Sequence, residues 1–123
     1  MSTLLLIGVG GASGALARHA VNQVASTQFD SVLLGTFIAN ISGSLILGLS
    51  LGFLSSHTAW QEEARLFLAV GFLGSYTTFS TLSVASVQLL ERGDLSSAAI
   101  NLAGSVALGL IAALAGLLVG RAI

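Results

Sequence analysis

The sequence predicts an all-α membrane protein with four transmembrane helices. Of its 123 residues, 54% are hydrophobic and only 7% are charged, whereas a soluble domain carries about a quarter charged residues. The charged residues also divide the chain into four apolar stretches, each close to the roughly 20 residues that span a bilayer core. These stretches are residues 3–24, 32–54, 66–90 and 97–120. We therefore expect one multi-pass domain in the cell membrane, with the lipid bilayer as its surroundings.

The charged and reactive residues exclude several classes of function. Four Arg, no Lys and five acids give a net charge of -1, which provides neither a basic stripe for nucleic acid nor a polybasic patch for anionic lipid. The absence of Cys excludes a cysteine nucleophile and a thiolate metal site. The two His lie far apart in the sequence, and no nucleophile, base and orienting group occur together. We expect neither an enzyme nor a nucleic-acid partner.

The links between the four stretches are short, so neighbouring helices are predicted to pack antiparallel. They cover residues 25–30, 55–65 and 91–94. Trp60 in the second link is predicted to anchor the chain at the membrane interface. The N-terminal residues lack the basic region of a secretory signal, so we interpret the first stretch as a retained helix.

Glycine is frequent and proline is absent, with 15 Gly and no Pro in the chain. Small residues allow the backbones of membrane helices to approach closely. The glycines predicted to do so are Gly10, Gly11, Gly14, Gly43, Gly48, Gly104 and Gly109.

The arginines give little preference for one orientation in the membrane. With both termini in the cytoplasm, Arg65 and Arg121 would lie inside and Arg92 outside, while Arg18 lies within the first helix. The positive-inside rule needs a larger imbalance to fix the topology. Insertion either way up suits an antiparallel dimer of oppositely inserted copies, and the chain is too short to form a pore alone.

The third apolar stretch contains an unusual number of hydroxyl groups, with seven hydroxyl residues among positions 71–83. Consecutive Ser and Thr side chains compete for backbone hydrogen bonds, and Gly lowers the cost of leaving helical geometry. These features predict a break in the third helix between Gly74 and Thr78. Unwound backbone at membrane depth persists only where protein or a wet cavity satisfies it.

Such a break offers two kinds of ion chemistry. The freed carbonyl oxygens can hold a hard cation such as Na⁺, and the new helix N-terminus favours an anion. After the break, several hydroxyl donors lie beside Phe79, whose ring edge carries positive potential. They belong to Thr78, Ser80, Thr81 and Ser83. This set suits a small anion that must shed its water. The alternative is a kink that binds no ion and whose free backbone groups hydrogen-bond only to neighbouring helices.

Further polar residues lie in the other apolar stretches. Asn40 is in the second stretch, and Asn101 and Ser105 are one turn apart in the fourth. Buried amides need hydrogen-bond partners or a polar path, so both an ion pathway and simple interhelical hydrogen bonding are open. Two interpretations of Arg18 are open. It has a functional role, or its long aliphatic stem lets the charged group reach the membrane interface.

Three segments carry a family resemblance. They are Gly10-Gly11-Ala12-Ser13-Gly14-Ala15-Leu16-Ala17-Arg18, Gly35-Thr36-Phe37-Ile38-Ala39-Asn40 and Gly71-Phe72-Leu73-Gly74-Ser75-Tyr76-Thr77-Thr78-Phe79-Ser80-Thr81. Together they resemble the small fluoride channels called Fluc or CrcB, and the third segment is the most specific. The resemblance extends over essentially the whole chain in length and helix count.

The resemblance implies a dual-topology dimer with two fluoride pathways, passive fluoride export and a central structural Na⁺ at two crossing helix breaks. By matching motifs, the carbonyls of Gly74 and Thr77 would hold Na⁺, and Arg18 would match the family's arginine of the first helix. The predicted fluoride pathway comprises Asn40, Phe79, Ser80, Thr81, Ser83, Asn101 and Ser105.

Two departures from the family pattern leave the subunit arrangement open. Leu82 stands where the family usually has a second Phe, and residues 84–88 lack the acid that usually follows. Some family members are pairs of unlike subunits, so a heterodimer with a related subunit competes with the homodimer. Two other functions remain as alternatives: a small proton-coupled exporter and a non-conducting partner subunit. An exporter would need an acid within the membrane, whereas every acid here is predicted in a loop or at an interface.

Overall fold

The structure is a computed structural model that describes residues 2–57 and 61–123. Within these residues, four segments are long and apolar enough to cross a membrane, which confirms the four predicted spans. Trp60 lies outside the described residues, so its role as an interfacial anchor stays a prediction. The elements are α1 (Thr3–Phe29), α2 (Val32–Ser55), α3 (Gln61–Ala64), the π-helix η1 (Arg65–Leu73), α4 (Gly74–Tyr76), α5 (Phe79–Glu91) and α6 (Leu95–Ala122).

The first helix is longer than its apolar stretch. We predicted a link over residues 25–30, but α1 continues to Phe29, so that boundary is wrong. The hydroxyl of Thr27 donates to the Gln23 carbonyl at 2.9 Å within the same helix, so a polar residue is accommodated without ending it. The helix ends at Asp30, whose left-handed backbone (φ 52°) directs its N–H to the Ala25 carbonyl.

Four helix starts share one capping arrangement. The side chain of the residue before each helix accepts a hydrogen bond from the backbone N–H three residues later, which satisfies a donor that the helix leaves free. The capping residues are Ser2 for α1, Ser31 for α2, Thr78 for α5 and Asp94 for α6.

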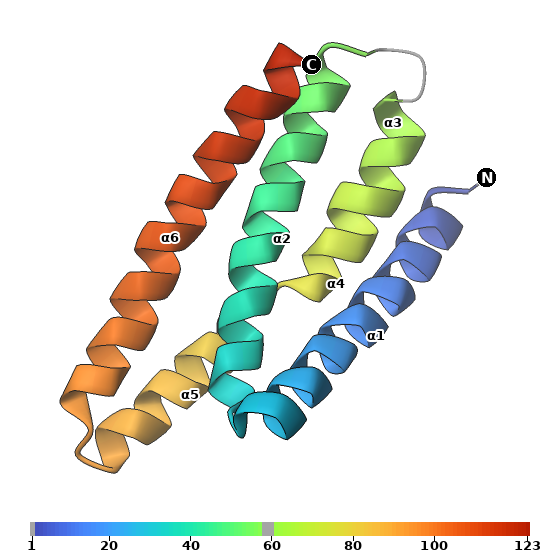
Figure 1. Cartoon of the computed structure of the whole chain (residues 1–123). Helices are drawn as coiled ribbons and strands as arrows, with labels where there is room; N and C mark the ends of the chain where they lie inside the picture. The colour runs from blue at the N-terminus through green and yellow to red at the C-terminus, as the bar shows by residue number, and fades with distance from the viewer. Residues whose placement is uncertain (1, 58–60) are drawn as a thin grey trace.

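The helices lie side by side, with both chain termini at the same end of the molecule (Figure 1). The segment α3–η1–α4 lies between α1 and α2, and α6 flanks the opposite side of α2. Beyond α4 the chain changes neighbours, because η1 and α4 pack against α1 whereas α5 packs against α6. Helix α2 contacts both halves of this third membrane segment.

Glycines produce the closest approach between α1 and η1. A Cβ atom on Gly10 would collide with the Phe67 carbonyl, and one on Gly14 would collide with the Phe72 carbonyl. Gly11 lies nearby, where a Cβ would stand 3.2 Å from the Ser75 hydroxyl oxygen. The predicted close packing at these three glycines is confirmed.

The seam between α2 and α6 also depends on glycine, though not on all the residues predicted. A Cβ on Gly48 would collide with the Ala113 carbonyl, as expected. The predictions for Gly104 and Gly109 are wrong, since added Cβ atoms there would have nearest neighbours at 3.9 and 3.7 Å. Gly116 and Gly120 make the close contacts instead, because α6 approaches α2 most tightly in its C-terminal half.

Candidate functional site

Two residues of extended backbone separate α4 from α5. Thr77 has φ -91° and ψ 154°, and Thr78 has φ -150° and ψ 116°. The backbone N–H of Thr77 still donates to the Leu73 carbonyl at 3.1 Å, and the Thr77 hydroxyl donates to the same oxygen at 3.0 Å. Helical bonding stops at this point, and the next residue finds its partner on another helix.

Asn40 of α2 supplies that partner through both ends of its amide. Its Oδ1 accepts from the Thr78 N–H at 2.8 Å, and its Nδ2 donates to the Thr78 carbonyl at 3.1 Å. This pair replaces the bonds that a helix would have given Thr78. One turn further along α2, a Cβ on Gly43 would collide with the Thr77 methyl group, so Gly43 accommodates a side chain rather than the helix backbone that we predicted. Helix α2 thus holds both extended threonines.

Arg18 reaches the same region from α1. Its Nε donates to the Ser75 carbonyl at 3.0 Å, and the side chain is half-buried. Ser75 lies at the carboxyl end of α4, where a positive charge complements the helix dipole. The guanidinium group therefore pairs with a carbonyl that has no partner within α4, close to the extended threonines.

The carbonyls around Thr77 and Thr78 fall into two groups. Those of Leu73, Ser75 and Thr78 accept the hydrogen bonds already described. Among the residues that the structure describes, the carbonyls of Gly74, Tyr76 and Thr77 accept none. The Gly74 and Thr77 oxygens are the two expected from the motif to bind Na⁺, and the Tyr76 oxygen was not expected.

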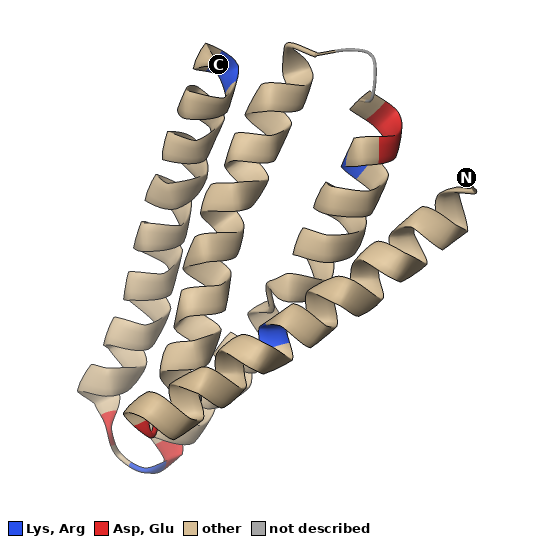
Figure 2. Cartoon of the chain, turned by 45° about the vertical axis from the view of Figure 1, so that its right-hand side comes forward, with Lys and Arg blue, Asp and Glu red and all other residues tan. Residues whose placement is uncertain are grey.

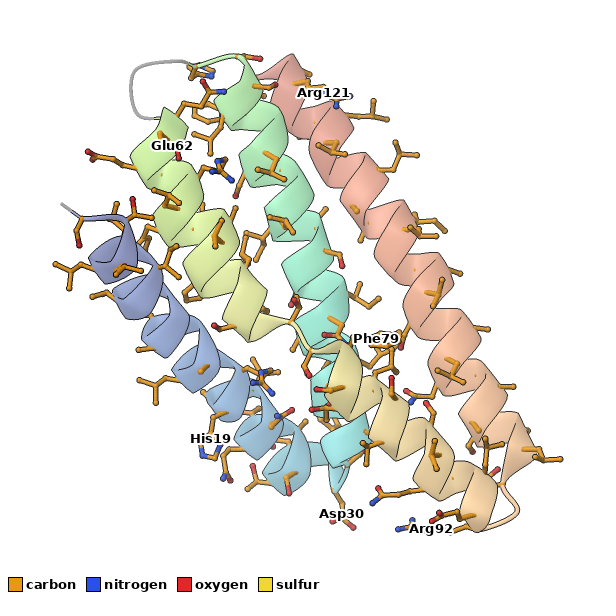
Figure 3. All side chains as sticks on the ribbon, turned by 180° about the vertical axis from the view of Figure 1, so that it is seen from behind. His19, Asp30, Glu62, Phe79, Arg92 and Arg121 are labelled. Atoms are coloured by element: carbon orange, nitrogen blue, oxygen red, sulfur yellow. The ribbon has the colours of Figure 1, made fainter. Side chains whose placement is uncertain are left out.

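Hydroxyl groups cluster where α5 begins. The Thr78 hydroxyl lies 3.2 Å from both the Ser80 and the Thr81 hydroxyl oxygens. Ser83 does not share this cluster, because its hydroxyl donates to the Phe79 carbonyl at 2.9 Å within α5. Phe79 is 78% exposed and lies at the start of α5 (Figure 3).

The polar residues of α6 pair with α5. Asn101 donates through Nδ2 to the Ser86 hydroxyl oxygen at 2.9 Å, and Ser86 donates to the Leu82 carbonyl at 2.8 Å. Within the described residues, the buried Ser105 hydroxyl has no hydrogen-bond partner. Asn101 therefore has the interhelical partner that our alternative interpretation anticipated. The structure thus brings Asn40, Ser80 and Thr81 to Thr78, while Asn101 joins Ser86, whose role the sequence reasoning missed.

A groove of about 540 Å³ adjoins the hydroxyl cluster, and we call it the α2–α5 groove. Its lining includes Ser80 and Thr81, which the sequence singled out, together with Thr36, Gln88 and Arg92, which it did not. The helical spacing of residues 80, 84, 88 and 92 on one face of α5 was the signal that could have identified the last two. The lining residues are Leu33, Thr36, Ser80, Thr81, Val84, Ala85, Gln88, Leu89 and Arg92.

Comparison with known proteins gives near full-length matches. The model of the family described as CrcB-like protein, Camphor Resistance (CrcB) matches residues 5–117. The chain is 42% identical over 118 residues to a protein of Nitrobacter hamburgensis named fluoride-specific ion channel FluC 2, with 95% of each chain covered. It is 42% identical over 122 residues to the fluoride-specific ion channel FluC of Rhodopseudomonas palustris, with 98% of each chain covered. A Paracoccus denitrificans protein of the same name is 43% identical over 119 residues, covering 97% of this chain and 94% of the relative.

Proposed function

Because the chain belongs to the CrcB family, we propose that it is a subunit of a fluoride-selective channel that lets fluoride leave the cell passively. The observation that carries this proposal is the near full-length similarity to proteins named fluoride-specific ion channels. Those relatives are named as channels rather than enzymes. The hydroxyl cluster at the start of α5 supplies donors suited to a small anion.

We propose that the working unit is an antiparallel dimer of two copies inserted in opposite orientations. Phe79 supports this arrangement, because its ring is largely exposed although it lies beside the hydroxyl cluster. A second copy crossing at Thr77 and Thr78 would cover the ring and place it against a polar pathway. Thr77 and Thr78 would then be the break of the third helix at which the two copies meet. We prefer a homodimer, with a related unlike subunit as the alternative partner.

A Na⁺ ion would be held at that crossing by the carbonyls of Gly74 and Thr77 from both copies. Carbonyl oxygens suit a hard cation, and these two lack a hydrogen-bond donor among the described residues. The ion would stabilise the dimer by neutralising converging carbonyl dipoles. Prolonged dialysis into Na⁺-free buffer should weaken dimer assembly and conduction. Equal assembly and conduction after dialysis, with no density at the dimer midline, would contradict this role.

Fluoride is costly to dehydrate, so selectivity requires several close donors in a narrow passage. Asn40 has a second amide proton beyond the one that it donates to Thr78. This proton, the hydroxyls of Ser80 and Thr81, and the positive edge of the Phe79 ring would replace water around the ion. Measurable chloride current through the wild-type protein would contradict this account of selectivity.

The test of the proposed function is fluoride efflux from liposomes that contain the purified chain alone. A passive channel should release fluoride only when a potassium ionophore compensates the charge, and a proton gradient should not drive it. Release driven by protons would support the exporter instead. No efflux from the chain alone, with efflux once a related subunit is added, would identify this chain as a non-conducting partner.

A further inference from the structure

The α2–α5 groove follows one face of α5 from the extended threonines toward the end of the helix. Its α5 wall has Ser80 and Thr81 at one end and Arg92, immediately after α5, at the other. At 1.5 Å per residue, Ser80 and Arg92 are separated by about 18 Å along the helix. This length is about half of the roughly 30 Å hydrocarbon core. The groove therefore has the reach to connect mid-membrane depth with one membrane surface.

The polar groups along this wall are all capable of donating hydrogen bonds. The hydroxyls of Ser80 and Thr81 lie at the inner end, and the amide of Gln88 and the guanidinium of Arg92 lie at the outer end. One apolar turn, Val84 and Ala85, separates the two pairs. The lining contains no carboxylate among the residues described. Donors without acceptor-only groups favour an anion over a cation.

The surroundings of the outer end carry the opposite charge. Asp30 lies at the same end of the molecule as Arg92 (Figure 3), and Glu91 and Asp94 are its near neighbours in sequence. Figure 2 shows this end with several acidic positions around one basic position. Hydrogen bonds from Ser97 lower the pKa of Asp94, so its carboxylate stays ionised at neutral pH. An anion approaching this end thus meets three carboxylates.

Arg92 is the positive charge placed to offset them. Within the described residues the one salt bridge is between Arg65 and Glu62, and Arg92 makes none. Its backbone N–H bonds to the Gln88 carbonyl at the end of α5. A charge at the edge of a cleft with low-dielectric walls raises the local concentration of oppositely charged ions.

We propose that the α2–α5 groove is the mouth through which the anion enters from this end, with Arg92 as the attracting charge and Gln88 as the next donor. The proposal rests on the proposed fluoride channel and adds a specific access route to it. Arg92 draws the anion past the neighbouring carboxylates, and Gln88 bridges toward the hydroxyls of Ser80 and Thr81 across one apolar turn.

The test compares Arg92→Gln with Arg65→Gln, which removes the same charge from a residue that does not line the groove. Fluoride efflux from liposomes is measured at about 10 mM and about 1 M of a salt whose ions are not carried, conditions in which the Debye length is about 30 and 3 Å. Arg92→Gln should lower efflux about 3- to 10-fold at low salt and approach the wild-type rate at high salt. Arg65→Gln should match the wild type in both, and Arg92→Lys should retain most of the rate.

A second pair of variants tests the donor next to Arg92. Gln88→Glu keeps the size of the side chain but adds a carboxylate to the groove, so it should lower efflux most strongly at low salt. Gln88→Leu removes the donors without adding charge, so its smaller loss should not depend on salt. Each variant must elute as the wild type does in size-exclusion chromatography, which separates these effects from misassembly.

The possible failures can be told apart. If wild-type efflux is robust but the efflux of Arg92→Gln equals that of the wild type at low salt, the groove is not the mouth. The proposed channel function is then still supported. A loss in Arg92→Gln that is the same at both salt concentrations would also overturn the attracting role. If the wild type releases no fluoride either alone or together with a related subunit, the proposed function fails, and the access route fails with it.

Discussion

The two halves of the third membrane segment differ in what their side chains contact. Before Thr77, η1 and α4 pack against α1 across glycines, and Leu73 and Tyr76 belong to the buried core. After Thr78, α5 exposes the Phe79 ring and borders a groove. One stretch of chain therefore provides packing on one side of two residues and accessible polar surface on the other.

The extended threonines make this division possible, because they let α5 leave α1 and pack against α6. Three hydrogen bonds with side chains of other helices compensate the lost helical bonding. Asn40 accepts one and donates one, and Arg18 donates the third. Buried polar backbone is costly unless it is paired. Substitutions before Thr77 should therefore affect assembly first, whereas substitutions after Thr78 should affect ion flux first.

The largest effect is expected at the seam between α1 and η1. Gly14→Ala places a Cβ against the Phe72 carbonyl, which is backbone and moves only if the helices separate. Overpacking of this kind costs about 1–3 kcal/mol and sometimes more. We expect Gly14→Ala to lower the temperature at which the protein loses its monodisperse elution peak, and to abolish fluoride efflux with it.

Gly8→Ala is the matched control for this substitution. A Cβ on Gly8 has no neighbour within 4 Å, and the higher helix propensity of Ala should leave stability equal or slightly improved. Equal thermal stability for Gly14→Ala and Gly8→Ala would show that the first half is not the tightly packed part of the segment.

The second prediction concerns the residue that contacts the interruption. Asn40→Asp keeps an acceptor for the Thr78 N–H but turns a carboxylate oxygen toward the Thr78 carbonyl in place of a donor. The added negative charge also repels fluoride. We expect efflux to be nearly abolished while the elution profile stays that of the wild type.

Asn40→Ala separates the two causes, since it removes both hydrogen bonds without adding charge. Its efflux should fall less than that of Asn40→Asp. Unchanged efflux in Asn40→Asp would assign Asn40 to helix packing alone and remove it from the predicted pathway.

The sequence predicted the four spans because hydropathy dominates the choice of membrane segments. It misplaced the end of α1, since hydropathy does not register the polar helical turn around Thr27. It chose Gly104 and Gly109 instead of Gly116 and Gly120, because the position where two helices come closest depends on how they cross. The residue types were visible in the sequence, but the contacts were not.

The candidate site shows the same limit. Consecutive Ser and Thr near Gly74 drew attention to the segment that contains the extended Thr77 and Thr78. The local sequence could indicate this position, because Ser and Thr side chains compete with nearby backbone groups for hydrogen bonds. The pairing of Asn101 with Ser86 depends on α5 crossing to α6, which no local pattern reveals. The assignments of the Na⁺ ligands and of the fluoride pathway stay predictions.

The smallest effect is expected at Leu82, three residues after Phe79. Leu82 is 6% exposed and faces the interior of the chain, whereas Phe79 faces outward. An aromatic edge contact is worth on the order of 1 kcal/mol, which corresponds to about a factor of several in rate. Leu82→Phe should therefore change efflux by no more than such a factor, because Asn40, Phe79, Ser80 and Thr81 remain.

The Leu82→Phe experiment also decides between the two kinds of dimer. A larger ring at a buried position costs packing energy, so Leu118→Phe, at a 56% exposed position on α6, controls for the change of side chain alone. Reconstituted without any other subunit, the wild-type chain should release fluoride, which would exclude an obligate unlike partner. If the wild type shows no efflux and Leu82→Phe does, an unlike subunit normally supplies the missing ring. The homodimer is preferred because the arginine distribution permits both orientations of one chain, so a single sequence can supply both members of an antiparallel pair.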